Sequence, residues 1–205
     1  MTTLYKYTTL EGALAIIKNN SIGFSCAENL NDPFELKGAS YLLVDSTLDG
    51  TLDGTSGAFN KLSRKFGILS LTRTHLNPIM WSLYSNQHRG VVIAFDVKKA
   101  GLTCRSLIPS HKGNVIYSKT HPKNAFETEQ GDYFDIYELC KKHCYSELTE
   151  KEKILVSMFF LHKSDWWFHE EDVRVVKNLE NSVMPTSLHF AQLDLITSRN
   201  LIPID

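Results

Sequence analysis

The sequence lacks a long hydrophobic run and has no charge of one dominant sign. No window of about 18 apolar residues occurs, so we expect no membrane-spanning segment. The opening MTTLYKYTTLEG has no basic segment followed by an apolar one, so it does not look like a secretory signal and a cytoplasmic location is expected. The formal net charge of the 205 residues is -1, so no overall positive field favours nucleic acid or an anionic membrane.

Metal-binding and phosphate-binding motifs are also missing. The four cysteines are expected to be reduced thiols. Cys140 and Cys144 would share a helix face, with His143 nearby, but zinc usually takes four ligands and no second pair occurs, so no metal site is predicted. The aspartates of the Leu-Asp-Gly repeat in residues 45–57 are four apart, which differs from a calcium loop and predicts a flexible surface excursion. No glycine-rich phosphate loop occurs.

The apolar residues predict a mixture of strands and helices. Strands are predicted over residues 4–7, 22–26, 67–73, 90–96, 114–119, 172–177 and 188–196. Helices are predicted after Thr8, which has capping-box spacing to Glu11, after Asn77-Pro78, and over residues 58–66, 133–148 and 150–163. Because these elements lack a regular βαβ rhythm, the chain is predicted to be a single α+β domain over residues 1–205.

Several polar residues occupy positions from which they could line a site. Lys6 lies between two tyrosines on the first predicted strand. Ser70 and Thr72 alternate with leucines and therefore share one strand face. Trp81 and Tyr84 are three apart and can line one helix face, although a place in the core explains them as well.

The segment HEEDVR, residues 169–174, places three acids where a buried strand begins. If the strand starts there, Glu170 and Asp172 point the same way, and their repulsion requires a cation, a metal or a ligand hydroxyl nearby. Arg174 could supply that cation. A solvated turn, a structural ion pair and an active site all fit this pattern.

These residues resemble the bacterial and phage family of unknown function DUF2971. The family's late motif reads tryptophan, two spacers, glutamate, spacer, glutamate, usually an aromatic residue, then arginine. Here these positions hold Trp167, Glu170, Asp172, Val173 and Arg174, so the second acid is shortened and the aromatic residue is lost. The matching segments are LYKY (4–7), NDPFE (31–35), ILSLT (68–72), MWSLYSNQHRGVVIAFD (80–96) and WFHEEDVR (167–174).

A more distant resemblance is to ADP-ribosyltransferases that act on nucleic acid. LYKYTTLEGALAIIKNNSIGFS is similar to their first strand and helix, with Lys6 at the basic position, and SLT (70–72) and EED (170–172) follow in the expected order. This resemblance implies a mixed split β-sheet flanked by helices, with NAD bound as a substrate in its cleft and a protein or nucleic acid as acceptor. A toxin or defence role would suit such a protein.

The same resemblance implies roles for individual residues. Asp172 would stabilise the cationic ribose formed when the glycosidic bond breaks, and Glu170 would orient or deprotonate the acceptor. Trp81 or Tyr84 would stack on the nicotinamide ring. The residues expected to contact NAD are Lys6, Tyr7, Thr8, Ser70, Thr72, Trp81, Tyr84 and Arg174.

Two other functions fit the sequence. A metal-dependent phosphoesterase or nuclease would gather Asp32, Glu35, Glu170 and Asp172 around magnesium. A non-catalytic binding module would use NDPFE and HEEDVR as structural polar networks, and the shortened acid at position 172 favours this alternative.

Overall fold

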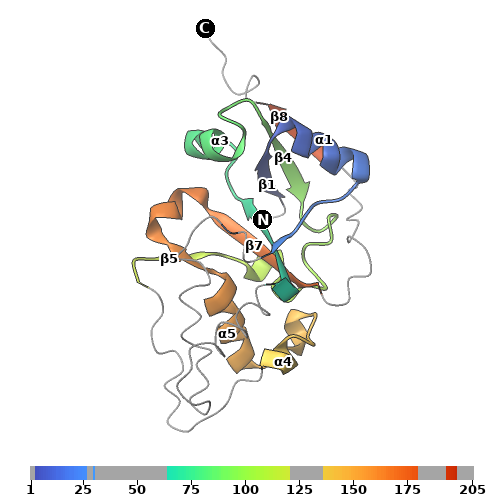
Figure 1. Ribbon diagram of the computed structural model, residues 1–205, viewed down its shortest axis with the longest axis vertical. Helices are drawn as coiled ribbons and strands as arrows, with labels where there is room; N and C mark the ends of the chain where they lie inside the picture. Colours follow the sequence, from blue (N-terminus) through green and yellow to red (C-terminus); the bar gives the residue numbers. More distant parts are fainter. Residues whose placement is uncertain (1–2, 27–29, 31–63, 121–135, 180–192, 198–205) are drawn as a thin grey trace.

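Six strands form one antiparallel sheet in the computed structural model, which describes residues 3–26, 30, 64–120, 136–179 and 193–197 (Figure 1). Five of them follow the order β2-β3-β1-β4-β8, and β7 pairs with the other edge of β3. Their bounds are Thr3–Thr8 (β1), Ser25–Cys26 (β2), Phe66–Thr72 (β3), Val91–Asp96 (β4), Asp172–Asn178 (β7) and Leu193–Thr197 (β8).

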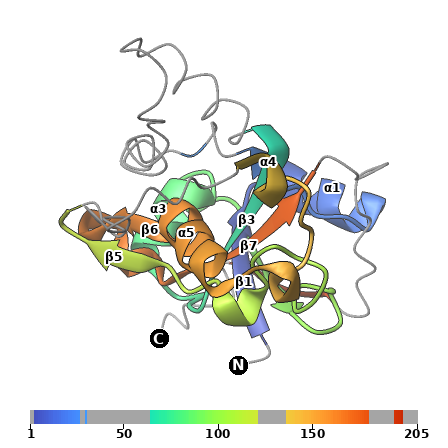
Figure 2. The same ribbon diagram turned by 90° about the horizontal axis from the view of Figure 1, so that it is seen from below.

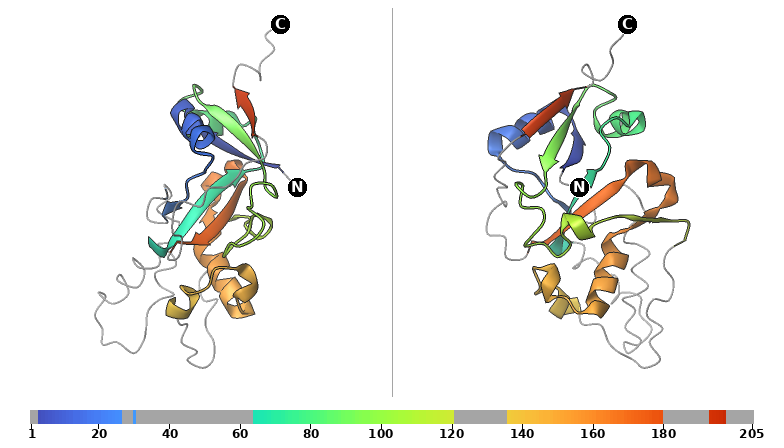
Figure 3. Two further views of the ribbon diagram at one scale, coloured as in Figure 1. Left: turned by 90° about the vertical axis from the view of Figure 1, so that its right-hand side faces the viewer. Right: turned by 180° about the vertical axis from the view of Figure 1, so that it is seen from behind.

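The sheet is split between β1 and β3. These two strands pair at a single position, Tyr5 with Thr72, whereas β1 pairs with β4 from Thr3 to Thr8 and β3 pairs with β7 along its whole length. In Figure 1 the half that contains β1, β4 and β8 lies above the half that contains β3 and β7, and Figure 3 shows the same separation from two other sides. The two halves therefore diverge from one shared point.

A second sheet has two strands, which pair in parallel. Its strands are Ile116–Ser118 (β5) and His162–Ser164 (β6). Seen from below, this small sheet and the helix α1 lie on opposite sides of β1 and β7 (Figure 2). The predicted α+β class is confirmed, but the main sheet is antiparallel in every pair that the structure describes rather than mixed.

Helices pack on the sheet and bury three apolar clusters. The α-helices are Leu10–Asn19 (α1), Pro78–Tyr84 (α3), Ile136–Leu139 (α4) and Glu150–Phe160 (α5), and the 3-10 helices are Ser110–Lys112 (η3), Tyr145–Glu147 (η4) and Asp165–Glu170 (η5). The clusters centre on Phe159 and Phe160 of α5, on Ile93 and Phe95 of β4, and on Trp81 of α3. No helix in the described ranges has the length and apolar composition needed to cross a membrane.

Side-chain caps fix where the helices begin. Asn77 accepts hydrogen bonds from the backbone N–H groups of Ile79 and Met80, and Thr149 forms the predicted capping box with Glu152. The cap of α1 was predicted one residue too early, because Thr8 belongs to β1 and Thr9 accepts from the N–H of Gly12.

Two predicted helices are too long, and in both cases a distant residue explains why. Of the described residues in the helix predicted over 133–148, residues 136–139 form α4, and the chain then turns before η4. The side-chain amide of Asn178 holds this turn, because it donates to the backbone carbonyls of Cys140 and Lys142. The helix predicted over 150–163 ends at Phe160, whose carbonyl accepts from Arg174, and residues 162–164 join β6 instead.

Other predictions on the fold are partly confirmed. The strand predicted over 22–26 is reduced to Ser25–Cys26, and the last predicted strand appears as β8. The predicted excursion at 45–57, the segment at 31–35, and residues 58–63 and 188–192 of predicted elements lie outside the described residues.

Candidate functional site

A cavity of about 240 Å³ lies where the two halves of the sheet separate. It brings together eight of the ten residues that the sequence predicted for the site, namely Lys6, Tyr7, Ser70, Thr72, Tyr84, Glu170, Asp172 and Arg174. The remaining lining residues are Tyr5, Ser25, Leu30, Ile68, Leu71, Met80 and Lys163. Polar groups from both ends of the sequence therefore share one hollow.

The pairing of β3 with β7 places four of these side chains on one face. Ser70 pairs with Arg174 and Thr72 pairs with Asp172, so the four side chains project to the same side of the two strands. The leucines and valines that alternate with them, Leu69, Leu71, Val173 and Val175, belong to one of the buried apolar clusters. The expectation that Ser70 and Thr72 share a strand face is thus confirmed.

Glu170 reaches the cavity by a different route from the one predicted. It ends η5 rather than starting a strand, and β7 begins only at Asp172. Glu171 between them has a left-handed backbone, with φ of 46°, which reverses the chain at the end of the 3-10 helix. The strand therefore does not include Glu170, contrary to what the prediction assumed, but both side chains line the same cavity.

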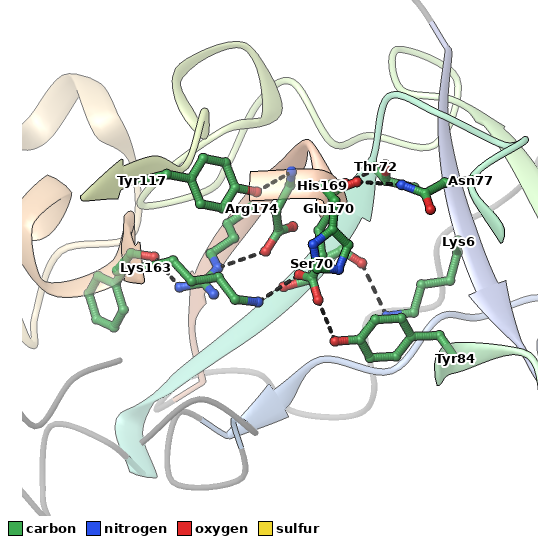
Figure 4. Close-up of polar contacts among 12 residues, drawn as sticks. Lys6, Ser70, Thr72, Asn77, Tyr84, Tyr117, Lys163, His169, Glu170 and Arg174 are labelled. Carbon is green, nitrogen blue, oxygen red and sulfur yellow. Dashed lines mark hydrogen bonds and ion pairs between the residues drawn. The ribbon is translucent and has the colours of Figure 1, made fainter. Parts of the chain in front are cut away.

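Both carboxylate oxygens of Glu170 have partners inside the protein (Figure 4). Lys163 Nζ lies 2.6 Å from Oε2, and the hydroxyl of Tyr84 donates to Oε1 at 2.5 Å. The side chains of Lys163 and Glu170 are only 6% and 5% exposed, so this is a buried ion pair. The hydroxyl of Thr72 donates to the backbone carbonyl of Glu170 at 2.6 Å and fixes the end of η5 against β3.

Asp172 forms the second buried acid–base pair. Its Oδ2 lies 3.3 Å from Nε of Arg174, and both side chains are almost fully buried. Arg174 also donates from Nη1 to the carbonyl of Phe160 at 2.7 Å, which anchors the guanidinium to the end of α5. The backbone N–H of Asp172 donates to the hydroxyl of Tyr117 at 2.8 Å, and burial raises the pKa of Tyr117.

Lys6 crosses the split in the sheet. Its ammonium group donates to the backbone carbonyl of Ser70 at 3.1 Å, which links β1 to β3 beyond their single paired position (Figure 4). Burial lowers the pKa of Lys6, while the negative charges of Asp172 and Glu170 act in the opposite direction. The cavity thus contains a cation on the first strand that faces two acids from the last third of the chain.

Two of the predicted site residues are not among those that line the cavity. Trp81 is 4% exposed and belongs to the core: its indole N–H donates to the carbonyl of His75, and its ring packs edge-on against Tyr7 at 5.5 Å. Thr8 ends β1 and pairs with Val91. The position of Trp81 favours the core alternative, because an aromatic residue on an amphipathic helix more often buries area than contacts a ligand.

Lys163 and Tyr117, which contact Glu170 and Asp172 respectively, were not predicted from the sequence. Lys163 was assigned to the end of a helix, but it lies on β6 with its Nζ 5.0 Å from the ring centre of Trp167. The available signal was its place between a long apolar run and the three acids of 170–172, since a buried lysine requires an acidic partner.

The described residues provide no cluster for a metal ion. Within the described ranges, no group of three or more histidine, cysteine or acidic side chains is arranged to hold one. Asp32 and Glu35, expected in the alternative magnesium site, lie outside the described residues. Cys140 and Cys144 do not share a helix face, because α4 ends at Leu139 and Cys144 is the N-cap residue that precedes η4.

The comparisons with known proteins find one matching family model and no named activity. The family model described as "Protein of unknown function (DUF2971)" matches residues 80–175. This segment contains Tyr84, Lys163, Glu170, Asp172 and Arg174, whereas Lys6, Ser70 and Thr72 precede it. No curated protein and no solved structure matched the chain.

Proposed function

We propose that this chain, whose residues 80–175 match the DUF2971 family model, is an ADP-ribosyltransferase-like protein that uses NAD as substrate and modifies a macromolecular acceptor. One observation carries the proposal: Lys6 of the first strand and the acids Glu170 and Asp172 line a single cavity at the split of the sheet. Such a gathering of buried titratable groups in a hollow is typical of active sites.

The size of the cavity limits which part of NAD it can enclose. Its volume of about 240 Å³ is below the range of about 300–1,000 Å³ that is usual for pockets enclosing drug-sized ligands. We therefore place the nicotinamide and its ribose inside, with the adenosine half outside. Lys6 donates one hydrogen bond to Ser70, and an ammonium group has three donors, so it can also bind an oxygen of the diphosphate.

Asp172 has the geometry to stabilise the reacting ribose. Its carboxylate is 3% exposed and lies in the cavity wall, with Arg174 on one oxygen. Breaking the bond between the ribose and nicotinamide places positive charge on the sugar. A carboxylate that accepts a hydrogen bond from a ribose hydroxyl stabilises this charge, and burial strengthens the effect because little water screens it.

A non-catalytic binding module is the second candidate. It is favoured by the pairing of each buried acid with a protein cation, Lys163 for Glu170 and Arg174 for Asp172. A network that is satisfied in this way can be structural, since buried polar groups are retained when all of their partners are present.

Incubation with labelled NAD and a cell lysate separates these functions. We expect transfer of label to a macromolecule by the wild-type protein and loss of transfer in Asp172→Ala and Glu170→Ala. Glu138→Ala is the matched control, because this carboxylate is 56% exposed and pairs with Lys141. Unchanged NAD turnover in both site variants would show that the assignment is wrong. Stabilisation by NAD without turnover would identify a binding module instead.

A further inference from the structure

Tyr84 connects the cavity to Glu170. It is the last residue of α3, while Glu170 is the last residue of η5, and the two side chains meet although they are 86 positions apart. Both line the cavity, so a ligand there would lie beside the hydrogen bond between them (Figure 4).

The direction of this hydrogen bond determines what Tyr84 can do next. A phenol has one proton to donate and lone pairs that accept. Because the proton of Tyr84 points to Oε1 of Glu170, any further hydrogen bond at Oη is one that Tyr84 accepts. A protic group that enters the cavity next to Tyr84 must therefore direct its own proton at this oxygen.

Glu170 is held in place for such an exchange. Its other oxygen, Oε2, lies 2.6 Å from Lys163 Nζ, and the lysine is fixed in turn over the ring of Trp167. Because both side chains are almost fully buried, little water can reach them and replace either partner of the ion pair. The ion pair therefore fixes Oε1 in its direction toward Tyr84.

We propose that Tyr84 is a catalytic residue that accepts the proton of the incoming nucleophile while its own proton passes to Glu170, with Lys163 as a positioning residue for Glu170. This inference rests on the proposed function. The bond between the ribose carbon and nicotinamide breaks, and its electron pair leaves with nicotinamide. The acceptor oxygen or nitrogen forms a bond to that carbon and releases its proton to Tyr84 Oη. The hydroxyl proton of Tyr84 moves to Oε1 of Glu170, which later releases it to solvent.

The test is Tyr84→Phe in the full chain, measured with NAD and the acceptor fraction of the lysate. This variant keeps the ring and removes only the hydroxyl. We expect NAD affinity to stay within about twofold and turnover to fall by about 10²-fold or more, the usual range for loss of general acid–base catalysis. Tyr145→Phe is the matched control, since Tyr145 packs against Lys153 away from the cavity.

Rates in mixtures of light and heavy water give a second measurement that a structural role would not change. If two protons move in the rate-limiting step, a plot of the wild-type rate against the fraction of deuterium bows below a straight line. The same plot for Tyr84→Phe should be straight. For Lys163→Arg, which keeps the charge but moves its position, we expect kcat to fall while KM for NAD is unchanged.

The outcomes separate the two proposals. Wild-type protein that turns over NAD, with equal turnover and equal isotope behaviour in Tyr84→Phe, would overturn the inference and leave the proposed function intact. Wild-type protein that neither binds nor cleaves NAD would overturn the proposed function, and this inference with it. Loss of turnover in Tyr84→Phe together with the straight line would support both.

Discussion

The ion pair between Lys163 and Glu170 allows a stability prediction with a control built into the same chain. Lys142 and Glu152 form a second pair with the same distance of 2.6 Å. The two pairs differ in burial, because the side chains of Lys163 and Glu170 are 6% and 5% exposed, whereas those of Lys142 and Glu152 are 23% and 11% exposed. Replacing each lysine by methionine therefore tests the effect of burial at constant distance.

We expect Lys163→Met to lower the free energy of unfolding by about 3–5 kcal/mol. The substitution removes the cation from Oε2 of the buried Glu170 carboxylate, while the hydroxyl of Tyr84 still donates to Oε1. Removing one partner of a buried pair costs about this much. The substitution also removes the contact of the Lys163 ammonium group with the ring of Trp167, which contributes roughly 0.5–2 kcal/mol. This contribution is included in the range of about 3–5 kcal/mol and favours its upper part.

Lys142→Met should cost about 1 kcal/mol or less. Glu152 keeps the hydrogen bonds from the backbone N–H and the hydroxyl of Thr149, so its carboxylate still has two hydrogen-bond donors. Water also reaches this pair more easily and screens the attraction.

Urea unfolding followed by circular dichroism measures both variants. A loss in Lys163→Met no larger than that in Lys142→Met would refute the reasoning. The double variant Lys163→Met with Glu170→Leu should recover most of the loss, because it removes the unpaired charge together with its partner.

Two further predictions concern the free energy of unfolding. Burial raises the pKa of Tyr7 to about 12 from its ordinary value of 10, so the folded protein keeps a proton that the unfolded chain loses between these pH values. Because solvent screens part of this effect, the free energy of unfolding should fall by about 1–2 kcal/mol across this window, and by correspondingly less in Tyr7→Phe, in denaturation curves recorded from pH 9 to 12. Gly113→Ala should destabilise the protein by about 3 kcal/mol or more, since the added Cβ would lie 1.8 Å from the backbone oxygen of Arg174. Gly23→Ala is the control and should be neutral or slightly stabilising in the same assay, because a Cβ added there meets no atom within 4 Å. Equal effects of the two substitutions would contradict this prediction.

Local patterns in the sequence predicted the elements of the site better than its partners. The alternation around Ser70 and Thr72 gives their shared strand face, and Asn77-Pro78 gives the start of α3, because both depend on neighbours in sequence. The contact of Lys6 with Ser70 depends on how β1 and β3 diverge, which no local pattern determines. The order of the motifs suggested that they meet, but it could not supply the distances.

The errors have the same physical origin. Lys163 was placed at the end of a helix because the apolar run before it continues to His162, yet Arg174 takes the carbonyl of Phe160 and the chain leaves the helix there. Trp81 had the spacing of a pocket residue, but its ring packs against Tyr7 on another element. In each case a residue distant in sequence decides the outcome, and one sequence does not reveal that residue.

The most direct test of the central claim is calorimetric titration of NAD into the wild-type protein and into Lys6→Met. The claim is that the cavity at the split of the sheet binds NAD and that Lys6 holds its diphosphate. We expect saturable binding at one site in the wild type and a loss of about 10–100-fold in affinity in Lys6→Met, which corresponds to the roughly 1.5–3 kcal/mol of a hydrogen bond to a charged group. Lys98→Met, at an exposed position on the surface, is the control and should bind like the wild type. No saturable binding in the wild type, or equal affinity in Lys6→Met, would contradict the account.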